Sequence, residues 1–328
     1  MAPEVPSPVI DLRPFTTSEL IDRGFSLYRQ NFAGLLLLAL LGQAAPLMLE
    51  ALVNMLHLMP SANDMLVAST RSVENSFVLT LLSLFALLVS FFFGVVMTFY
   101  VSDAYLGKTP SVADCFRRFG RCVAESVWTF LLKYAFYGLT LVFPMIAAVA
   151  VTVWYNVWPP ASFASFVLLG FAVVVLSVAS LVPILIVVMR LMLAVPVLAM
   201  EGLAGWAACR RSSALVRYDP GLGFFYWGET RLSLLLLPLF VIHLLISSLT
   251  SVPMGISQIN EILRHGATTQ LTNPPDAVVV GSQVLTYLAG ALILPLYTIA
   301  ITLFYYDVRI RREGFDLEFL AARLEAAR

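Results

Sequence analysis

Six apolar stretches, each long enough to cross a lipid bilayer, constrain this chain more than any other feature. They lie near 32–56, 76–105, 126–153, 163–200, 224–249 and 277–306. Because a spanning helix needs about 20 apolar residues, each stretch can form one. Charged residues make up only 12% of the chain, against about a quarter of a soluble domain. The sequence therefore predicts an all-α, polytopic membrane protein with six transmembrane helices.

Two of these stretches are longer than one span. In 163–200, Pro183 and Pro196 can bend the helix, and Arg190 marks the expected inner interface. The residues after Arg190 should then leave the lipid and pack beneath the neighbouring amphipathic segments. The last stretch continues into a basic segment, and Gly314 can end that helix. The outer loop before it is expected to hold a short helix near 257–264.

Three short amphipathic segments, which we call elbows, precede alternate apolar stretches. The elbows comprise 16–32, 111–122 and 205–217. Each places apolar residues on one side of a helix and charged residues on the other, as in a helix that lies at a membrane interface. Thr16 and Glu19 match the capping-box pattern at the start of the first elbow. Pro110 is expected in the first turn of the second, where its missing N–H costs nothing.

The elbows share a common spacing, which suggests an internal repeat. Arg23, Arg117 and Arg211 are each 94 residues apart, and each elbow precedes an apolar hairpin. This pattern predicts three elbow–hairpin units between a Pro-rich cytoplasmic lead and a C-terminal cytoplasmic helix. The expected boundaries are 1–15 for the lead, 16–108, 109–202 and 203–313 for the units, and 314–328 for the final helix.

The distribution of basic residues predicts the orientation in the membrane. With both termini inside, the outer loops contain only Arg71 and Arg264 of the 20 Lys and Arg residues. Cytoplasmic loops of membrane proteins carry such an excess of positive charge. Both termini and all three elbows are therefore expected on the cytoplasmic side, where the three cysteines would be reduced thiols.

Three patches resemble a known family. They are LRPFTTSELIDRGFSLYRQNF (12–32), RLMLAVPVLAMEGLAGWAACRRSSALV (190–216) and YYDVRIRREGFDLEFL (305–320). The chain is similar to bacterial polytopic proteins related to the membrane domain of glycerophosphodiester phosphodiesterases, most of which stand alone. The resemblance implies a six-span layout in the bacterial inner membrane. In the related enzymes catalysis resides in a separate soluble barrel downstream, and this chain ends after the last patch. No phosphodiesterase activity is therefore expected.

The elbow arginines are the leading candidates for a binding site. At the inner surface these arginines can attract anionic lipid. They can act only as the positive charge that sets the orientation in the membrane, with no defined ligand, or they can form a shaped head-group site where three elbows converge. The head-group candidates are Arg23, Arg117, Arg118, Arg211 and Arg217.

A second group of candidates consists of ionisable residues within or beside the spans. It comprises Arg190, Glu201, His243 and Asp307. Arg190 with Glu201, and Asp307 with Arg311, are expected to form ion pairs at the inner edge. These charged residues can serve either as structural ion pairs or as a relay for transport. His243 would lie deep in its span, either hydrogen-bonded to a neighbouring helix or transferring a proton.

No catalytic or cofactor motif accompanies these candidates. HExxH, GxSxG, P-loop and clustered metal-ligand patterns are absent, so no cofactor, metal or nucleic-acid partner is expected. The leading hypothesis is a non-enzymatic membrane protein that organises anionic lipid, or docks a partner protein, through a basic cytoplasmic collar. The main alternative is a small-molecule or lipid transporter with a cavity among the spans, and a membrane-embedded enzyme is the third.

Overall fold

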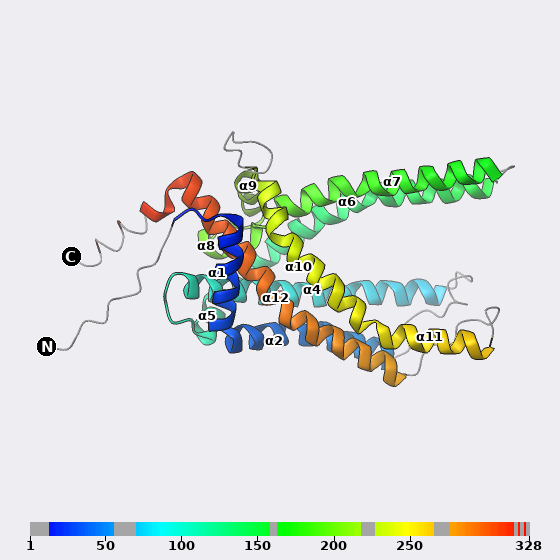
Figure 1. The fold of residues 1–328 in the computed structure, drawn as a ribbon, viewed down its shortest axis with the longest axis horizontal. Helices are drawn as coiled ribbons and strands as arrows, with labels where there is room; N and C mark the ends of the chain where they lie inside the picture. The colour runs from blue at the N-terminus through cyan, green and yellow to red at the C-terminus, as the bar shows by residue number, and fades with distance from the viewer. Residues whose placement is uncertain are drawn as a thin grey trace. The chain divides into compact units, whose positions relative to one another are not determined.

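The structure is a computed structural model in which all described regular structure is α-helical, as the sequence predicts (Figure 1). It describes residues 13–55, 70–157, 163–217, 227–265 and 276–317, with Ala321 and Glu325. The helices are α1 (Thr17–Gln30), α2 (Phe32–Met55), α4 (Thr70–Tyr105), α5 (Val112–Arg121), α6 (Val123–Val157), α7 (Phe163–Arg190), α8 (Ala194–Glu201), α9 (Gly205–Val216), α10 (Gly228–Thr250), α11 (Val252–His265) and α12 (Asp276–Glu313).

Six helical segments are long and apolar enough to cross a membrane, which confirms the prediction of a polytopic membrane protein. They are Phe32–Val53, Phe77–Tyr105, Val123–Ile146, Leu181–Glu201, Gly228–Asn260 and Ala277–Glu313. Many large apolar side chains on these segments are exposed, including Met48, Leu185 and Leu249. Such side chains suit a hydrocarbon environment.

The described helices form two compact units, and each is described by itself. The first unit comprises Met1–Val123 and Leu234–Arg328. In it α2 packs against α4 and α12, while α1 lies on α12, α5 on α4, and α11 on α12. Its core lies near the elbow ends of these helices and includes Leu38, Met97 and Phe304, all fully buried.

The second unit comprises Ala124–Ser233 and contains α6 to α9. Helix α7 ends at Arg190, and after a short turn α8 begins at Ala194. Val197 and Leu198 of α8 are buried, and both α7 and α8 contact α9. The predicted packing of the residues after Arg190 against an elbow is therefore confirmed, whereas the fourth candidate span, Leu181–Glu201, continues through α8.

Two local predictions about helix ends are confirmed and one is wrong. Thr16 and Glu19 form the capping box, and α12 ends before Gly314, whose φ is 66°. The second elbow, however, begins at Val112, so Pro110 lies before the helix. The Ser111 side chain accepts the Asp114 N–H and serves as the N-cap instead.

Other predicted segments differ in extent or lie outside the description. Helix α11 includes the short outer helix expected at 257–264 and begins several residues earlier, at Val252. Most of the predicted N-terminal lead falls on residues 1–12, which are outside the described residues. The same holds for most of the predicted C-terminal helix, of which Phe315–Leu317 are helical.

Candidate functional site

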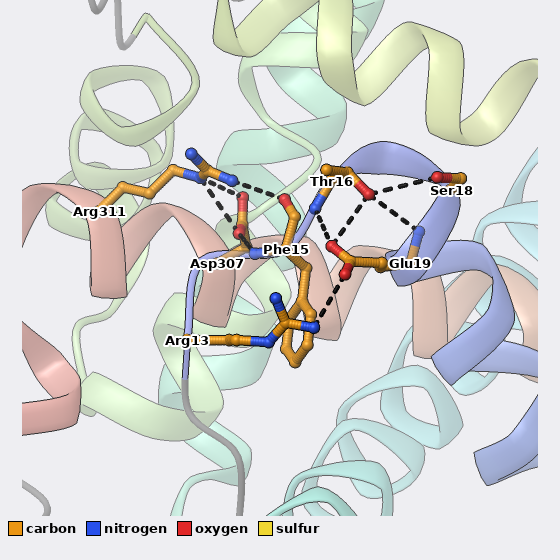
Figure 2. Close-up of polar contacts among 7 residues, drawn as sticks. All are labelled: Arg13, Phe15, Thr16, Ser18, Glu19, Asp307 and Arg311. Atoms are coloured by element: carbon orange, nitrogen blue, oxygen red, sulfur yellow. Dashed lines mark hydrogen bonds and ion pairs between the residues drawn. The ribbon is translucent and has the colours of Figure 1, made fainter.

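The start of the first elbow is attached to the end of α12 by an ion pair (Figure 2). This pair binds both the backbone N–H and the backbone carbonyl of Phe15. The fully buried Asp307 carboxylate accepts the Phe15 N–H at 2.9 Å. Arg311 lies one turn further along α12. Its Nε donates to both Asp307 oxygens at 3.1 and 3.0 Å, and its Nη2 donates to the Phe15 carbonyl. This arrangement confirms the predicted Asp307–Arg311 pair and gives it a structural role.

The first turn of α1 is closed by reciprocal capping bonds, also drawn in Figure 2. The Thr16 hydroxyl accepts the Glu19 N–H, and the Glu19 carboxylate accepts the Thr16 N–H at 2.7 Å. This backbone N–H, with the Thr16 hydroxyl and the nearby Arg13 guanidinium, lowers the pKa of Glu19. Arg13 also donates to Glu19 at 2.9 Å. Helix α1 therefore starts at a defined residue.

Helix α1 divides into a packed side and an exposed side. Leu20, Gly24 and Leu27 are buried, and a Cβ added at Gly24 would lie 3.5 Å from Ile299 of α12. Arg23 lies on the exposed side. The amphipathic pattern predicted for this elbow thus decides which of its side chains remain accessible.

In the second elbow, two neighbouring arginines have different environments. Arg118 forms an ion pair with Asp103 of α4 and lies over the Phe99 ring at 5.0 Å. Arg117 is 73% exposed, and its nearest carboxylate is the similarly exposed Asp114, at 3.5 Å. Arg118 therefore holds α5 against α4, whereas Arg117 projects from the surface.

Buried polar groups continue from this ion pair into the first unit. Asp103 is largely buried, and the preceding residue, Ser102, shares a short hydrogen bond of 2.5 Å with Tyr306 of α12. Cys115 is buried beside Arg118, and burial raises the pKa of its thiol. The free, buried thiol is consistent with a packing role.

In the second unit, two predicted site residues form ion pairs with unexpected partners. Glu201 accepts from Arg211 of α9 at 2.9 Å, and Arg190 donates to Glu229 at 2.8 Å. The predicted Arg190–Glu201 pair is therefore wrong. Helix α8 directs Glu201 toward the third elbow, while the carboxylate at the start of α10 reaches Arg190.

The start of the third elbow is closely packed against α6. The Gly205 N–H donates to the Thr129 hydroxyl at 2.8 Å, and Gly205 has a φ of 56°. A Cβ at this position would collide with the Trp128 indole. Glycine is therefore required for both conformation and space. At the other end of α9, Arg217 is exposed.

His243 lies in the fifth candidate span, as predicted, but its side chain is exposed. Among the described residues it has no hydrogen bond to a neighbouring helix. The neighbouring Val241 and Leu245 are exposed too. The structure therefore places this histidine on an apolar outer surface of α10.

One polar cluster escaped the sequence predictions. Glu50 of α2 accepts from Gln283 at 2.9 Å and from the Tyr287 hydroxyl at 2.6 Å, both on α12. Gln283 and Tyr287 are four residues apart and so share a helix face. The sequence does contain a signal for this cluster. Glu50 is a carboxylate within the first apolar stretch, and Gln283 and Tyr287 are hydrogen-bond donors four residues apart within the last one.

Among the described residues, no group of three or more His, Cys, Asp and Glu side chains is placed to hold a metal ion. Comparisons with family models, curated proteins and solved structures found no match.

Proposed function

We propose that this protein is a non-enzymatic, multi-pass protein of the bacterial inner membrane that binds and organises anionic lipid at its cytoplasmic face. Arg23, Arg117 and Arg217 are the proposed head-group contacts. Arg118 and Arg211, the other two candidates, have the structural task of holding their elbows to the fold. The excess of Lys and Arg in the segments expected on the cytoplasmic side supports this location.

The observation that carries the proposal is the division of elbow arginines into two classes. Arg118 and Arg211 meet partly buried carboxylates of neighbouring helices. Arg23 and Arg217 are exposed and, among the described residues, have no carboxylate partner. A planar guanidinium with unused donors can bind phosphate oxygens in a bidentate manner.

Exposed aromatic residues support an interfacial position for the elbows. Phe25 of α1, Phe116 of α5 and Trp206 of α9 are 42%, 36% and 60% exposed. Each lies on the same short helix as one or more arginines. Amphipathic helices with this composition lie at the boundary between head groups and acyl chains.

The proposed three-unit organisation agrees with the order of helix lengths. A short helix precedes two long ones in α1–α2–α4 and in α5–α6–α7, and α9 and α10 begin the same series. Helices α5 and α9 start 93 residues apart, at Val112 and Gly205, which is close to the spacing of the elbow arginines. We propose that the elbows are equivalent and share the cytoplasmic side.

The test measures which lipids the detergent-purified protein retains. The protein is mixed with phosphatidylglycerol and phosphatidylcholine, and native mass spectrometry gives the ratio of the two bound lipids. Arg23→Gln, Arg117→Gln and Arg217→Gln should each lower phosphatidylglycerol retention about fivefold, since one interfacial arginine contributes about 1 kcal/mol.

Lysine variants at the same positions are the matched controls, because they keep the charge and lose the planar fork. A loss with lysine indicates a shaped phosphate site, and retention with lysine indicates diffuse attraction that fades with salt. Unchanged lipid selectivity in the triple glutamine variant would refute lipid binding by these arginines. A partner protein docked at this face is the alternative outcome of such a result.

A small-molecule or lipid transporter is the second candidate function. The observation that favours it is the polar cluster around Glu50, because transporters place polar groups between their spanning helices.

A further inference from the structure

A polar pocket of about 600 Å³ lies within the first unit, between α2, α10, α11 and α12. Glu50 is 18 residues beyond the start of α2 at Phe32, which corresponds to about 27 Å along the helix axis. The pocket is therefore near the opposite end of these helices from α1, as the position of α11 shows in Figure 1. Its volume is within the range of small-molecule sites.

Glu50 provides the charge of the pocket, and two residues of α12 hold it in place. Gln283 donates to one carboxylate oxygen and the Tyr287 hydroxyl to the other. A carboxylate oxygen can accept more than one hydrogen bond, so each retains capacity for a ligand donor. The pocket therefore presents a fixed acceptor that the surrounding fold has already oriented.

The hydroxyl groups around Glu50 also face a ligand mainly as acceptors. Thr250 and Ser251 both donate to the Ser247 carbonyl, at 3.0 and 2.7 Å. Ser282 donates to the Val279 carbonyl at 2.8 Å. A hydroxyl has one hydrogen, so the lone pairs of these oxygens are what remains for a ligand.

The described residues that line this pocket include one carboxylate and no Lys, Arg or His side chain. An acceptor-rich, negatively charged surface fits a cation with several N–H donors. A quaternary ammonium lacks those donors and is usually held by aromatic cages, whereas the lining includes one aromatic ring, whose hydroxyl already binds Glu50. Calcium sites typically use six or more oxygen ligands, often from several carboxylates.

We propose that this pocket binds a primary ammonium group, with Glu50 as the counter-ion and the surrounding hydroxyls as acceptors. The ammonium can belong to a free small amine or to the head group of an aminophospholipid. Both sources have the same recognition chemistry, since the –NH₃⁺ group offers three donors to acceptors that are already in place.

The experiment titrates the detergent-purified full chain separately with the chloride salts of ethanolamine, choline and sodium, at matched ionic strength, and follows the thermal unfolding midpoint. Ethanolamine should raise the midpoint, whereas choline and sodium should not. In parallel, native mass spectrometry compares retention of phosphatidylethanolamine with phosphatidylcholine. A response to ethanolamine, to phosphatidylethanolamine, or to both supports the site and identifies the source of the ammonium group.

Two variants test the residues. Glu50→Gln is isosteric and should weaken ethanolamine binding or phosphatidylethanolamine retention at least about tenfold, as expected for loss of a charged hydrogen-bond partner. Thr286→Val leaves the charge and removes a lining hydroxyl, so a smaller loss is expected, and it decides the matter if Glu50→Gln fails to fold. Asp22→Asn removes an exposed carboxylate from α1 and is the control, with no expected loss.

The proposal is overturned if neither amine probe is bound, if choline or sodium acts as well as ethanolamine, or if both pocket variants bind like wild type. The result is independent of anionic lipid binding, because none of the three proposed head-group arginines lines the pocket.

Discussion

The most informative single perturbation is loss of the Asp307 carboxylate, because this group connects the first elbow to α12. Asp307→Ala removes the acceptor of the Phe15 N–H and both contacts with Arg311 Nε. The Asp307 side chain is fully buried, whereas Arg311 is 29% exposed. The variant therefore leaves a buried peptide N–H and a partly solvated guanidinium without their carboxylate.

The expected loss is about 3 kcal/mol of unfolding free energy. One hydrogen bond to a charged group contributes about 1.5–3 kcal/mol. Breaking a buried ion pair costs about 3–5 kcal/mol, and we use the lower end because water can reach part of Arg311. Replacing both members, as in Asp307→Leu with Arg311→Met, should cost less than the single change, since it leaves no unpaired charge.

Denaturant unfolding of the detergent-purified protein measures the loss, and hydrogen exchange at the start of α1 localises it. Asp307→Ala should lower the midpoint and increase exchange at residues 15–20, with Asp22→Asn as the exposed-carboxylate control. A loss below about 0.5 kcal/mol, which is typical of an exposed surface substitution, would refute the structural role assigned to this pair. A double variant that is less stable than the single variant would contradict the energetic reasoning.

Two further predictions concern the elbows. Gly205→Ala should destabilise the protein by at least about 1 kcal/mol more than Gly202→Ala. Both glycines have a positive φ, but only at Gly205 would the added Cβ collide with a neighbouring side chain. Equal unfolding midpoints of the two variants would contradict this. Because hydrogen bonds hold the pKa of Glu19 below its ordinary value of 4.5, its contribution to the start of α1 is present above that pH and is lost as pH falls through the lowered pKa. Hydrogen exchange corrected for intrinsic rates should show this loss in wild type and not in Glu19→Gln.

The spans and helix ends were predictable because their signals are local. Apolar length indicates a spanning helix without knowledge of its neighbours, and the Thr16–Glu19 pattern contains both halves of its capping box. Gly314 likewise ends α12 through its own backbone freedom. Even here Pro110 was misplaced, since the adjacent Ser111 offered a better cap.

The candidate site was less predictable, because an ion pair or hydrogen bond between two helices depends on the direction in which each helix runs and on which of its faces meets the other. Arg311 was assigned correctly to Asp307, one turn away on the same helix. Glu201 was assigned to the wrong arginine, because α8 turns it toward α9. The Glu50 pocket was missed for a related reason, since its donors become relevant only once α12 is known to face α2.

The central claim is that the elbows share the cytoplasmic side of the membrane, and cysteine accessibility in intact cells tests it most directly. Single cysteines are placed on a cysteine-free background at Ser18, Ala113 and Ala214 in the three elbows, and at Ser69 and Thr269 in the predicted outer loops. An impermeant maleimide should label the two loop positions from outside and reach the elbow positions only after the cells are permeabilised. Labelling of any elbow cysteine in intact cells would contradict the account.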